Sequence, residues 1–441
     1  MPSRCAQARP GTATRGKARS DAMIPLERER SLADADAVIR GYVRDQGWRM
    51  QIEVLGEGIA STVCTLYDAA GVALSNGFGK GEAAASLTGA MYEAVEHYYT
   101  RKPPADEPIA LVRSQQFAQD PRYAALPFAA AFEANAQQQL ACRTYRRLDE
   151  HGPGEDTVPV PLFMTYPAYL HNLVEGDDFD YTSAIRFSSN SGVAIGASLE
   201  EAAVHAIGEL VERDAWSLFL IAHYLGDPTR LGVIVDPQSL PDEVARIHRA
   251  VCGQLDREVW LIDVTTDLQF PAFIATTADI LADEETFPCG HGASLYAAHA
   301  ATRALTELVQ CIDIKSRTPK MREYSRLALD TLSDYRKLRD CAYFQVRADQ
   351  LERVDWAHPA RAAMAPKAML GAMIAHLRRH GIGVYYAINQ HAPGAFCIVS
   401  CVSFELERFF MVTSGIAMGP GRRGMDLLEG RLRVPALVPS A

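Results

Sequence analysis

Glu209 and Glu212 lie three positions apart in a stretch with the period of an α-helix, and Glu201 and His205 extend the same stripe toward its start. The other faces carry alanine, valine, leucine and tryptophan, which predicts a buried helix whose glutamates face an interior cleft. Buried carboxylates are stable only beside cations. Clustered carboxylates with nearby arginines suit Mg²⁺ held together with phosphate oxygens, so the stripe predicts a site for a nucleoside triphosphate.

A similar pattern occurs at two other places in the chain. Glu93 and Glu96 form the pair within AMYEAVEHYY, and Arg303, Glu307 and Gln310 form a charged stripe within RALTELVQ. Each helix follows a short glycine-bearing segment: SNGFGKG at 75–81, SNSGVAIGASL at 189–199 and GASL at 292–295. The self-similarity predicts one supersecondary unit used three times.

For any one of these helices the alternative is an exposed glutamate pair on a solvated face, the commoner case for a single helix. Three related helices with the charged stripe among apolar neighbours favour a shared site. Gly77–Gly81 offers backbone N–H groups for phosphates, with Lys80 as a point charge, but it lacks the Walker pattern and a plain glycine turn is an equal alternative. His205 is predicted to be a core histidine, and His291 and His299 to be structural.

The composition limits the class of protein. Lys and Arg number 44 against 54 Asp and Glu in 441 residues, a formal charge of −10, which excludes a binder that depends on a basic field for nucleic acid or an anionic membrane. The nine cysteines contain no CxxC pair and are typical of a reducing compartment, so we expect a soluble, cytoplasmic protein. The basic residues 1–22 are expected to be a disordered leader or an over-extended start before Met23.

The surrounding pattern predicts an α+β fold, with repeated loop–helix units and a mixed β-sheet around a central nucleotide cleft. Helices are expected at 31–46 and 361–380, and strands at 51–67, 72–74, 259–265, 271–277 and 383–389. Residues 103–160 are expected to be an inserted helical segment without chemistry. The predicted divisions are 1–22, an N-terminal helix and hairpin at 23–74, a catalytic domain at 75–415, and a C-terminal tail at 416–441.

In combination, these segments resemble the YcaO family over roughly residues 70–415. The family's three nucleotide motifs are similar to SNGFGKG…EAVEH, SSNSGVAIGASLEEAAVHAIGELVERDA and RALTELVQ. The resemblance implies an enzyme that uses ATP and Mg²⁺ to activate a backbone amide of a ribosomally made precursor peptide. An amide oxygen is a poor leaving group, and its phosphorylation makes it a good one.

Site roles follow from the resemblance position by position. The implied Mg²⁺ ligands are Glu93, Glu96, Glu209 and Glu212. The implied nucleotide contacts are Glu201, Arg303 and Glu307, with Gln310 as the next polar position. Azoline-forming relatives often end in a PxPxP tail that reaches the active site, and the degenerate match here gives Pro435 and Pro439 as the implied catalytic tail.

The favoured branch is a cyclodehydratase, in which a Cys, Ser or Thr side chain attacks the preceding carbonyl and loss of phosphate leaves a thiazoline or oxazoline. One alternative is a thioamide-forming member. Another is a catalytically lapsed scaffold or precursor-binding subunit, because His97 and Ala197 depart from the family pattern.

Family analogy also suggests partners. These are the precursor peptide, a leader-binding protein that is either ubiquitin-activating-enzyme-like or TfuA-type, and a flavin dehydrogenase. Whether two copies of the chain form a homodimer is left open.

Overall fold

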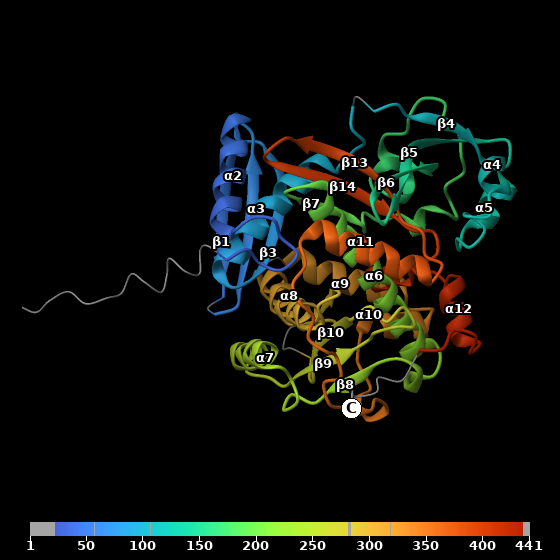
Figure 1. Cartoon of the computed structure of the whole chain (residues 1–441). Coiled ribbons are helices and arrows are strands. Elements are labelled where there is room, and N and C mark those ends of the chain that lie inside the picture. The colour runs from blue at the N-terminus through green and yellow to red at the C-terminus, as the bar shows by residue number, and fades with distance from the viewer. Residues whose placement is uncertain (1–22, 57, 106, 281–283, 318, 435–441) are drawn as a thin grey trace, which may run out of the picture.

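The computed structural model describes residues 23–434 except for 57, 106, 281–283 and 318. Three β-sheets surround a long central helix, α6 (Leu199–Leu220) (Figure 1). This arrangement confirms the predicted α+β class. The expectations for residues 1–22 and for the two tail prolines, Pro435 and Pro439, lie outside the described residues.

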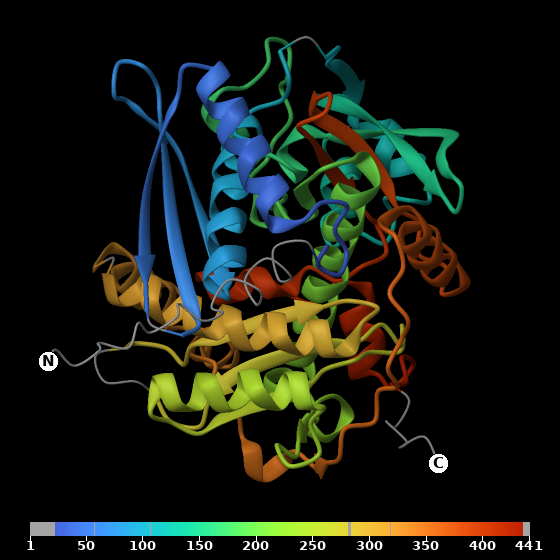
Figure 2. The same cartoon turned by 60° about the vertical axis from the view of Figure 1, so that its left-hand side comes forward.

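The N-terminal layer is an antiparallel sheet in the order β1-β2-β3, formed by Arg49–Leu55, Ala60–Tyr67 and Ala73–Gly81. Helices α2 (Leu32–Asp45) and α3 (Ala83–Tyr99) accompany it (Figure 2). Ser31 caps α2 by accepting a hydrogen bond from the backbone N–H of Asp34, as its position in the sequence predicts. The single strand expected at 51–67 is wrong, because the chain turns back between β1 and β2 to form a hairpin.

The six-stranded sheet follows the order β4-β5-β13-β14-β7, with β6 paired to β5. Its strands are Ala110–Arg113, Gln139–Asp149, Gly152–Pro161, Val193–Gly196, Tyr385–Ala392 and Phe396–Val402. The helical segment expected at 103–160 is therefore wrong for its second half, and only the short helices α4 (Ser114–Gln119) and α5 (Ala129–Ala134) belong to it. The prolines of β6 are tolerated because this strand pairs on one side only.

The five-stranded sheet follows the order β11-β10-β9-β8-β12. Its strands are Val233–Val235, Val259–Asp263, Ala272–Thr277, Cys289–Ala293 and Arg353–Val354. Helices α7 (Asp242–Leu255) and α8 (Ala297–Arg317) share an apolar cluster with this sheet (Figure 2), and α9 (Pro319–Thr331) and α10 (Arg336–Tyr343) follow α8 in the chain. Helix α11 (Pro366–Arg379) instead packs against α6 and β5.

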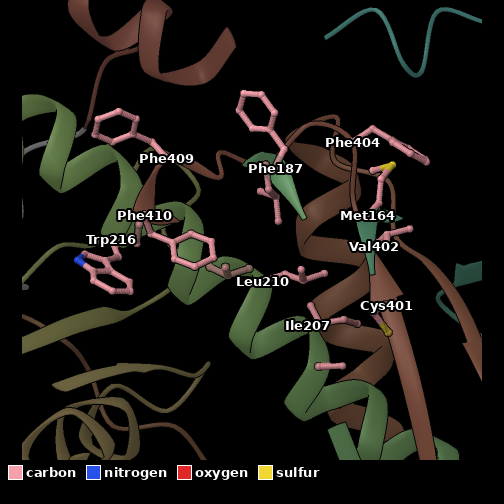
Figure 3. Close-up of a cluster of buried hydrophobic side chains, with 14 of the residues drawn as sticks. Met164, Phe187, Ile207, Leu210, Trp216, Cys401, Val402, Phe404, Phe409 and Phe410 are labelled. Carbon is pink, nitrogen blue, oxygen red and sulfur yellow. The ribbon is translucent and has the colours of Figure 1, made fainter. Parts of the chain in front are cut away.

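Helix α6 contributes to the largest apolar core. Of its 22 residues 17 are buried, including two of its glutamates, which confirms that it is an interior helix. Ile207 and Leu210 face Cys401 and Val402 of β14, while Trp216 lies beside Phe410 (Figure 3). A helix that is apolar on nearly every face can only sit between other layers.

The three related segments are strand–helix units: β3 with α3, β7 with α6, and β11 with α8. A Cβ atom at Gly79 would stand 1.7 Å from the carbonyl oxygen of Ser86, and one at Gly292 would stand 2.1 Å from that of Ala300. At Gly196 it would stand 2.4 Å from the backbone nitrogen of α6 residue Ala202. The repeated glycines therefore let the backbone of each strand contact its helix. In the first unit, the glycines of 77–81 lie in strand β3 and not in a turn or a phosphate loop.

The stretch after residue 415 contains helix α12 (Arg422–Leu428), where the sequence predicts only an irregular tail. The Arg423 guanidinium donates to the carboxylates of Asp214 on α6 and of Asp267. A helix of this length shows little periodicity, so only these long-range contacts identify it.

Within the part of the chain that the structure describes, no helix has the length and apolar character needed to cross a membrane. The eight cysteines within residues 23–434 are free thiols.

Candidate active site

The predicted glutamates of α3, α6 and α8 converge where the three strand–helix units meet. The charge of Glu209 acts on both Glu93 and Glu96, the charge of Glu93 acts on Glu96, and the charge of Glu307 acts on Glu93. Burial raises the pKa of Glu93 to about 7, and the charges of Glu209 and Glu307 contribute. Burial and then repulsion from Glu93 and Glu209 raise the pKa of Glu96 well above its ordinary value.

Lys80, at the end of β3, forms an ion pair with Glu307 of α8. The other Glu307 oxygen lies 3.2 Å from both the backbone nitrogen and the Nδ1 of His291. Burial alone would raise the pKa of Glu307, but Lys80, His291 and Arg213 outweigh it and hold the pKa well below its ordinary range. The structural role expected of His291 stays a prediction, and the structure adds that this side chain contacts Glu307.

Glu212 has arginines on both sides. Its oxygens lie 3.5 Å from a terminal nitrogen of Arg213 and 3.7 Å from one of Arg303. Arg213 also lies 3.5 Å from Glu209, whose second oxygen accepts a 3.3 Å hydrogen bond from the backbone N–H of Gly192. Arg213 was missed at the sequence level, although it directly follows Glu212 and belongs to the same polar stripe.

Glu201 sits in the first turn of α6, and the segment before α2 covers it. Arg28 donates to one oxygen at 3.1 Å, and the backbone N–H of Glu29 donates to the other at 2.9 Å. Glu27, with a positive φ of 65°, is buried next to His205 and accepts a hydrogen bond from Ser294. Local sequence patterns contain no signal for these contacts, because they link residues more than 170 positions apart.

The two remaining histidines flank Glu27. His205 Nδ1 lies 4.0 Å and His299 Nε2 lies 3.6 Å from the same Glu27 oxygen. His205 is buried as predicted, but its Nε2 has no hydrogen-bond partner among the described residues, so it is not a satisfied core histidine. Burial lowers the pKa of both imidazoles, which favours their neutral forms.

Gln310 lies one turn beyond Glu307 on α8, and its side chain forms no hydrogen bond to another described residue. His97, which stands where the family pattern has arginine, donates from Nδ1 to the backbone carbonyl of Asn76, and its Nε2 lies 3.7 Å from Glu93. Burial lowers the pKa of His97, so this position supplies less positive charge than an arginine would.

The donor set suits a metal ion shared with a phosphate chain. One Glu212 oxygen is buried without a hydrogen-bond partner, and so is the Nε of Arg303. Among the described residues, no three His, Cys, Asp or Glu side chains are grouped closely enough to chelate an ion by themselves. Mg²⁺ commonly binds one or two carboxylates and completes its shell with water and phosphate oxygens, so these residues fit Mg²⁺ together with a nucleotide.

A cavity of about 530 Å³ adjoins these carboxylates. Glu209 and Glu307 line it, and the rest of the wall includes Trp216, Phe410 and Cys311. The Trp216 and Phe410 rings stack with centroids 5.5 Å apart, and His291 lies over Trp216 at 3.9 Å. Figure 3 shows the two large rings side by side at this end of the apolar core.

The family profile described as YcaO cyclodehydratase, ATP- and Mg²⁺-binding, matches residues 76–404. The chain belongs to the YcaO family. ATP and Mg²⁺ are its cofactors, as expected from the resemblance.

Solved structures share the fold. A heterocyclase in complex with substrate and cofactor superimposes with a TM-score of 0.63 at 18% identity, covering 89% of this chain and 56% of that one. YcaO from Methanopyrus kandleri bound with AMPPCP and Mg²⁺ gives 0.59 at 17% identity, with 91% and 98% covered. A chain of the E. coli microcin synthetase McbBCD complex gives 0.51 at 13% identity, with 81% and 88% covered.

Two curated relatives match parts of the chain. An uncharacterized protein of Methanothermobacter thermautotrophicus is 30% identical over 231 residues, which is 50% of this chain and 52% of that protein. An uncharacterized protein in the tfuA 3′ region of Rhizobium leguminosarum bv. trifolii is 35% identical over 129 residues, which is 28% of this chain and 30% of that protein. The chain thus spans about half or less of the length of these relatives.

Proposed function

We propose that the protein is a peptide cyclodehydratase that uses ATP and Mg²⁺ to activate backbone amides of a ribosomally made precursor, forming thiazoline or oxazoline rings. The observation that carries the proposal is the convergence of carboxylates from three helices with Lys80, Arg213 and Arg303 beside a cavity. When bound, Mg²⁺ offsets the charge of the phosphate chain during phosphoryl transfer.

The chain's own residues have separate tasks in this proposal. The metal ligands would be Glu93, Glu96, Glu209 and Glu212, and the nucleotide contacts would be Lys80, Glu201, Arg303, Glu307 and Gln310. Arg213 and Arg303 flank Glu212 and hold its carboxylate in place, so the phosphates meet a site that needs little reorganisation. Arg28 fixes Glu201 at the start of α6.

Thioamide formation is the second candidate, and one observation favours it. The relative from Rhizobium leguminosarum is named for its place in a tfuA region, which supports a TfuA-type partner. The cyclodehydratase proposal instead involves a leader-binding, ubiquitin-activating-enzyme-like partner and a flavin dehydrogenase. The neighbour from the microcin synthetase complex supports an assembly of several proteins.

Mass spectrometry separates these candidates. The protein is co-expressed with the short Cys-, Ser- and Thr-rich peptide encoded nearest to its gene and with the partner encoded beside it. A cyclodehydratase removes one water per modified residue, whereas a thioamide-forming enzyme exchanges oxygen for sulfur. An unchanged peptide mass, with no peptide-dependent ATP hydrolysis, would favour the lapsed scaffold or precursor-binding subunit.

A further inference from the structure

Helices α6 and α8 carry their functional side chains in the same order. His205 and His299 flank Glu27 near the starts of the two helices, and Glu212 meets Arg303 further along. Beyond these contacts, toward the ends of both helices, α6 presents Arg213 and Trp216 to the cavity, and α8 presents Cys311 and Lys315. The two helices therefore run in the same direction along the site.

This order divides the site into two compartments. The covered Glu201 end lies toward the helix starts, and about 22 Å of α6 separates Glu201 from Trp216 at the usual helical rise. Glu209, a proposed metal ligand, and Glu307, a proposed nucleotide contact, also line the cavity. A phosphate chain held by these carboxylates would have the nucleoside on one side and the cavity on the other.

Phosphoryl transfer requires the attacking oxygen and the leaving oxygen to lie on opposite sides of the transferred group. With the nucleoside toward Glu201, the attacking oxygen must approach from the Trp216 side. The cavity of about 530 Å³ lies on that side and has the size of pockets that enclose a drug-sized ligand, which is also the size of a short peptide segment.

The cavity wall is suited to an uncharged ligand. Its charged groups already have partners: Arg213 pairs with Glu209, Lys80 with Glu307, and Lys315 Nζ lies 3.1 Å from Thr286 Oγ1 and 3.6 Å from Glu284. The rest of the wall combines aromatic and thiol side chains, such as Trp216, Phe410 and Cys311, with uncharged polar side chains, such as Ser189, Asn190 and Thr413.

Two polar groups at the wall lack partners. Trp216 is 9% exposed and His291 is 4% exposed, and neither the Nε1 of the first nor the Nε2 of the second has a hydrogen-bond partner among the described residues. An indole N–H is a donor, and a neutral imidazole that donates from Nδ1 to Glu307 leaves Nε2 as an acceptor. Together they match the C=O and N–H of a peptide backbone.

We propose, on the basis of the function proposed above, that this cavity receives the peptide segment whose amide is activated, with an uncharged residue directly before the reacting one. Burying a carboxylate there would place it against Glu209 and Glu307. The substrate class is therefore a precursor with an uncharged residue next to the modified position.

The experiment uses the full-length protein, Mg²⁺ and two synthetic probes, Ac-Gly-Leu-Cys-Gly-NH₂ and Ac-Gly-Asp-Cys-Gly-NH₂, at millimolar concentration. Cys311→Trp fills the cavity from α8, and Ser414→Trp narrows it at an exposed wall residue. Ser316→Trp is the matched control, because Ser316 is exposed on α8 and does not line the cavity. Stimulated ATP hydrolysis reports peptide binding, and calorimetry with AMPPCP and Mg²⁺ reports nucleotide binding.

The leucine probe should stimulate the wild type and Ser316→Trp at least about tenfold more than the aspartate probe. Both cavity variants should lose this stimulation while binding AMPPCP within about twofold of the wild type. The inference is overturned if a variant with normal AMPPCP affinity keeps full stimulation, if both probes act equally, or if neither acts on a wild type that binds AMPPCP. A wild type that binds no AMPPCP would refute the proposed function itself.

Discussion

Lys80 of β3 and Glu307 of α8 form an ion pair across 227 positions of sequence. The pair joins the first and third strand–helix units, while Glu212 and Arg303 join the second and third. Charged residues proposed to bind the nucleotide and metal thus also hold the three units in register. Substitutions at the site should therefore be assessed for binding and for folding separately.

Glu209→Gln and Glu212→Gln should both reduce ATP turnover about 100-fold or more, because each removes a ligand charge. Glu209→Gln should leave the melting temperature unchanged or higher, since burial raises the pKa of Glu209 and so disfavours its charge. Glu212→Gln should lower the unfolding free energy by about 1–3 kcal/mol, because it removes the negative charge that pairs with Arg213 and Arg303. Steady-state ATPase assays and denaturant titrations measure these effects.

Glu200→Gln is the control for both variants, since Glu200 lies on the same helix outside the cluster. Near-normal ATP hydrolysis in either glutamine variant would remove that residue from the metal assignment.

Arg303→Ala should weaken nucleotide binding by about 10- to 100-fold, the usual loss for one charge-assisted hydrogen bond. The side chain is partly buried next to Glu212, and its Nε lacks a partner among the described residues. Calorimetry with AMPPCP and Mg²⁺ measures the affinity. Arg246→Ala, at an exposed ion pair of α7, is the control. An unchanged nucleotide affinity in Arg303→Ala would exclude Arg303 from the site.

The stability of the metal-free protein should fall as pH rises through about 7. The folded pKa of Glu93 is about 7, whereas a glutamate in an unfolded chain titrates near pH 4.3. Between these values the folded protein binds the proton more tightly, so this contribution to stability is complete below pH 4.3 and is lost above 7. Thermal unfolding of chelator-treated protein measures the trend.

The same linkage predicts that Mg²⁺ binding releases protons and strengthens over this interval, because the ion requires the carboxylate. Glu93→Gln should show a smaller loss of stability with pH than the wild type. Identical pH profiles for the two proteins would contradict the assignment of this titration to Glu93.

Arg423→Ala should destabilise the protein by about 3–5 kcal/mol. It leaves Asp214, which is 0% exposed, without the guanidinium that binds both of its oxygens. Arg422→Ala, at the exposed neighbouring position, should change stability little. Equal unfolding free energies for the two variants would show that α12 is not anchored through Arg423.

Gly79→Ala should destabilise the first unit by about 3 kcal/mol or more, because the added methyl group collides with the backbone of α3 and neither element can move cheaply. Gly253→Ala is the matched control, because Gly253 lies in helix α7 and a Cβ atom added there would have no other atom within 4 Å. This variant should gain about 0.5–1 kcal/mol from helix propensity. Chemical denaturation compares the two, and a stable Gly79→Ala protein would refute the close packing.

The sequence was sufficient to predict the helices that carry the site and the faces that their glutamates share. Helical period alone places Glu209 and Glu212 together, and self-similarity relates them to Glu93 and Glu96. The contact of Arg28 with Glu201 could not be predicted, because no local pattern indicates which distant segment covers a helix start.

The misassigned segments have different physical causes. The strands at 139–149 and 152–161 contain proline and charged residues that suggest loops, and only pairing within the sheet makes them strands. The spacing of His291 from other histidines in the sequence does not match a metal-binding motif. Its contact with Glu307 arises because β11 and α8 lie next to each other.

The glycines that seat each strand against its helix have a further consequence for interpreting homologous sequences. Their identity is imposed by backbone contact, so a descendant that had lost all catalytic ability would still have to keep them in order to fold. Retention of those glycines in a homologue is thus uninformative about turnover, and only the acidic and basic side chains can distinguish a working enzyme from an inactive copy.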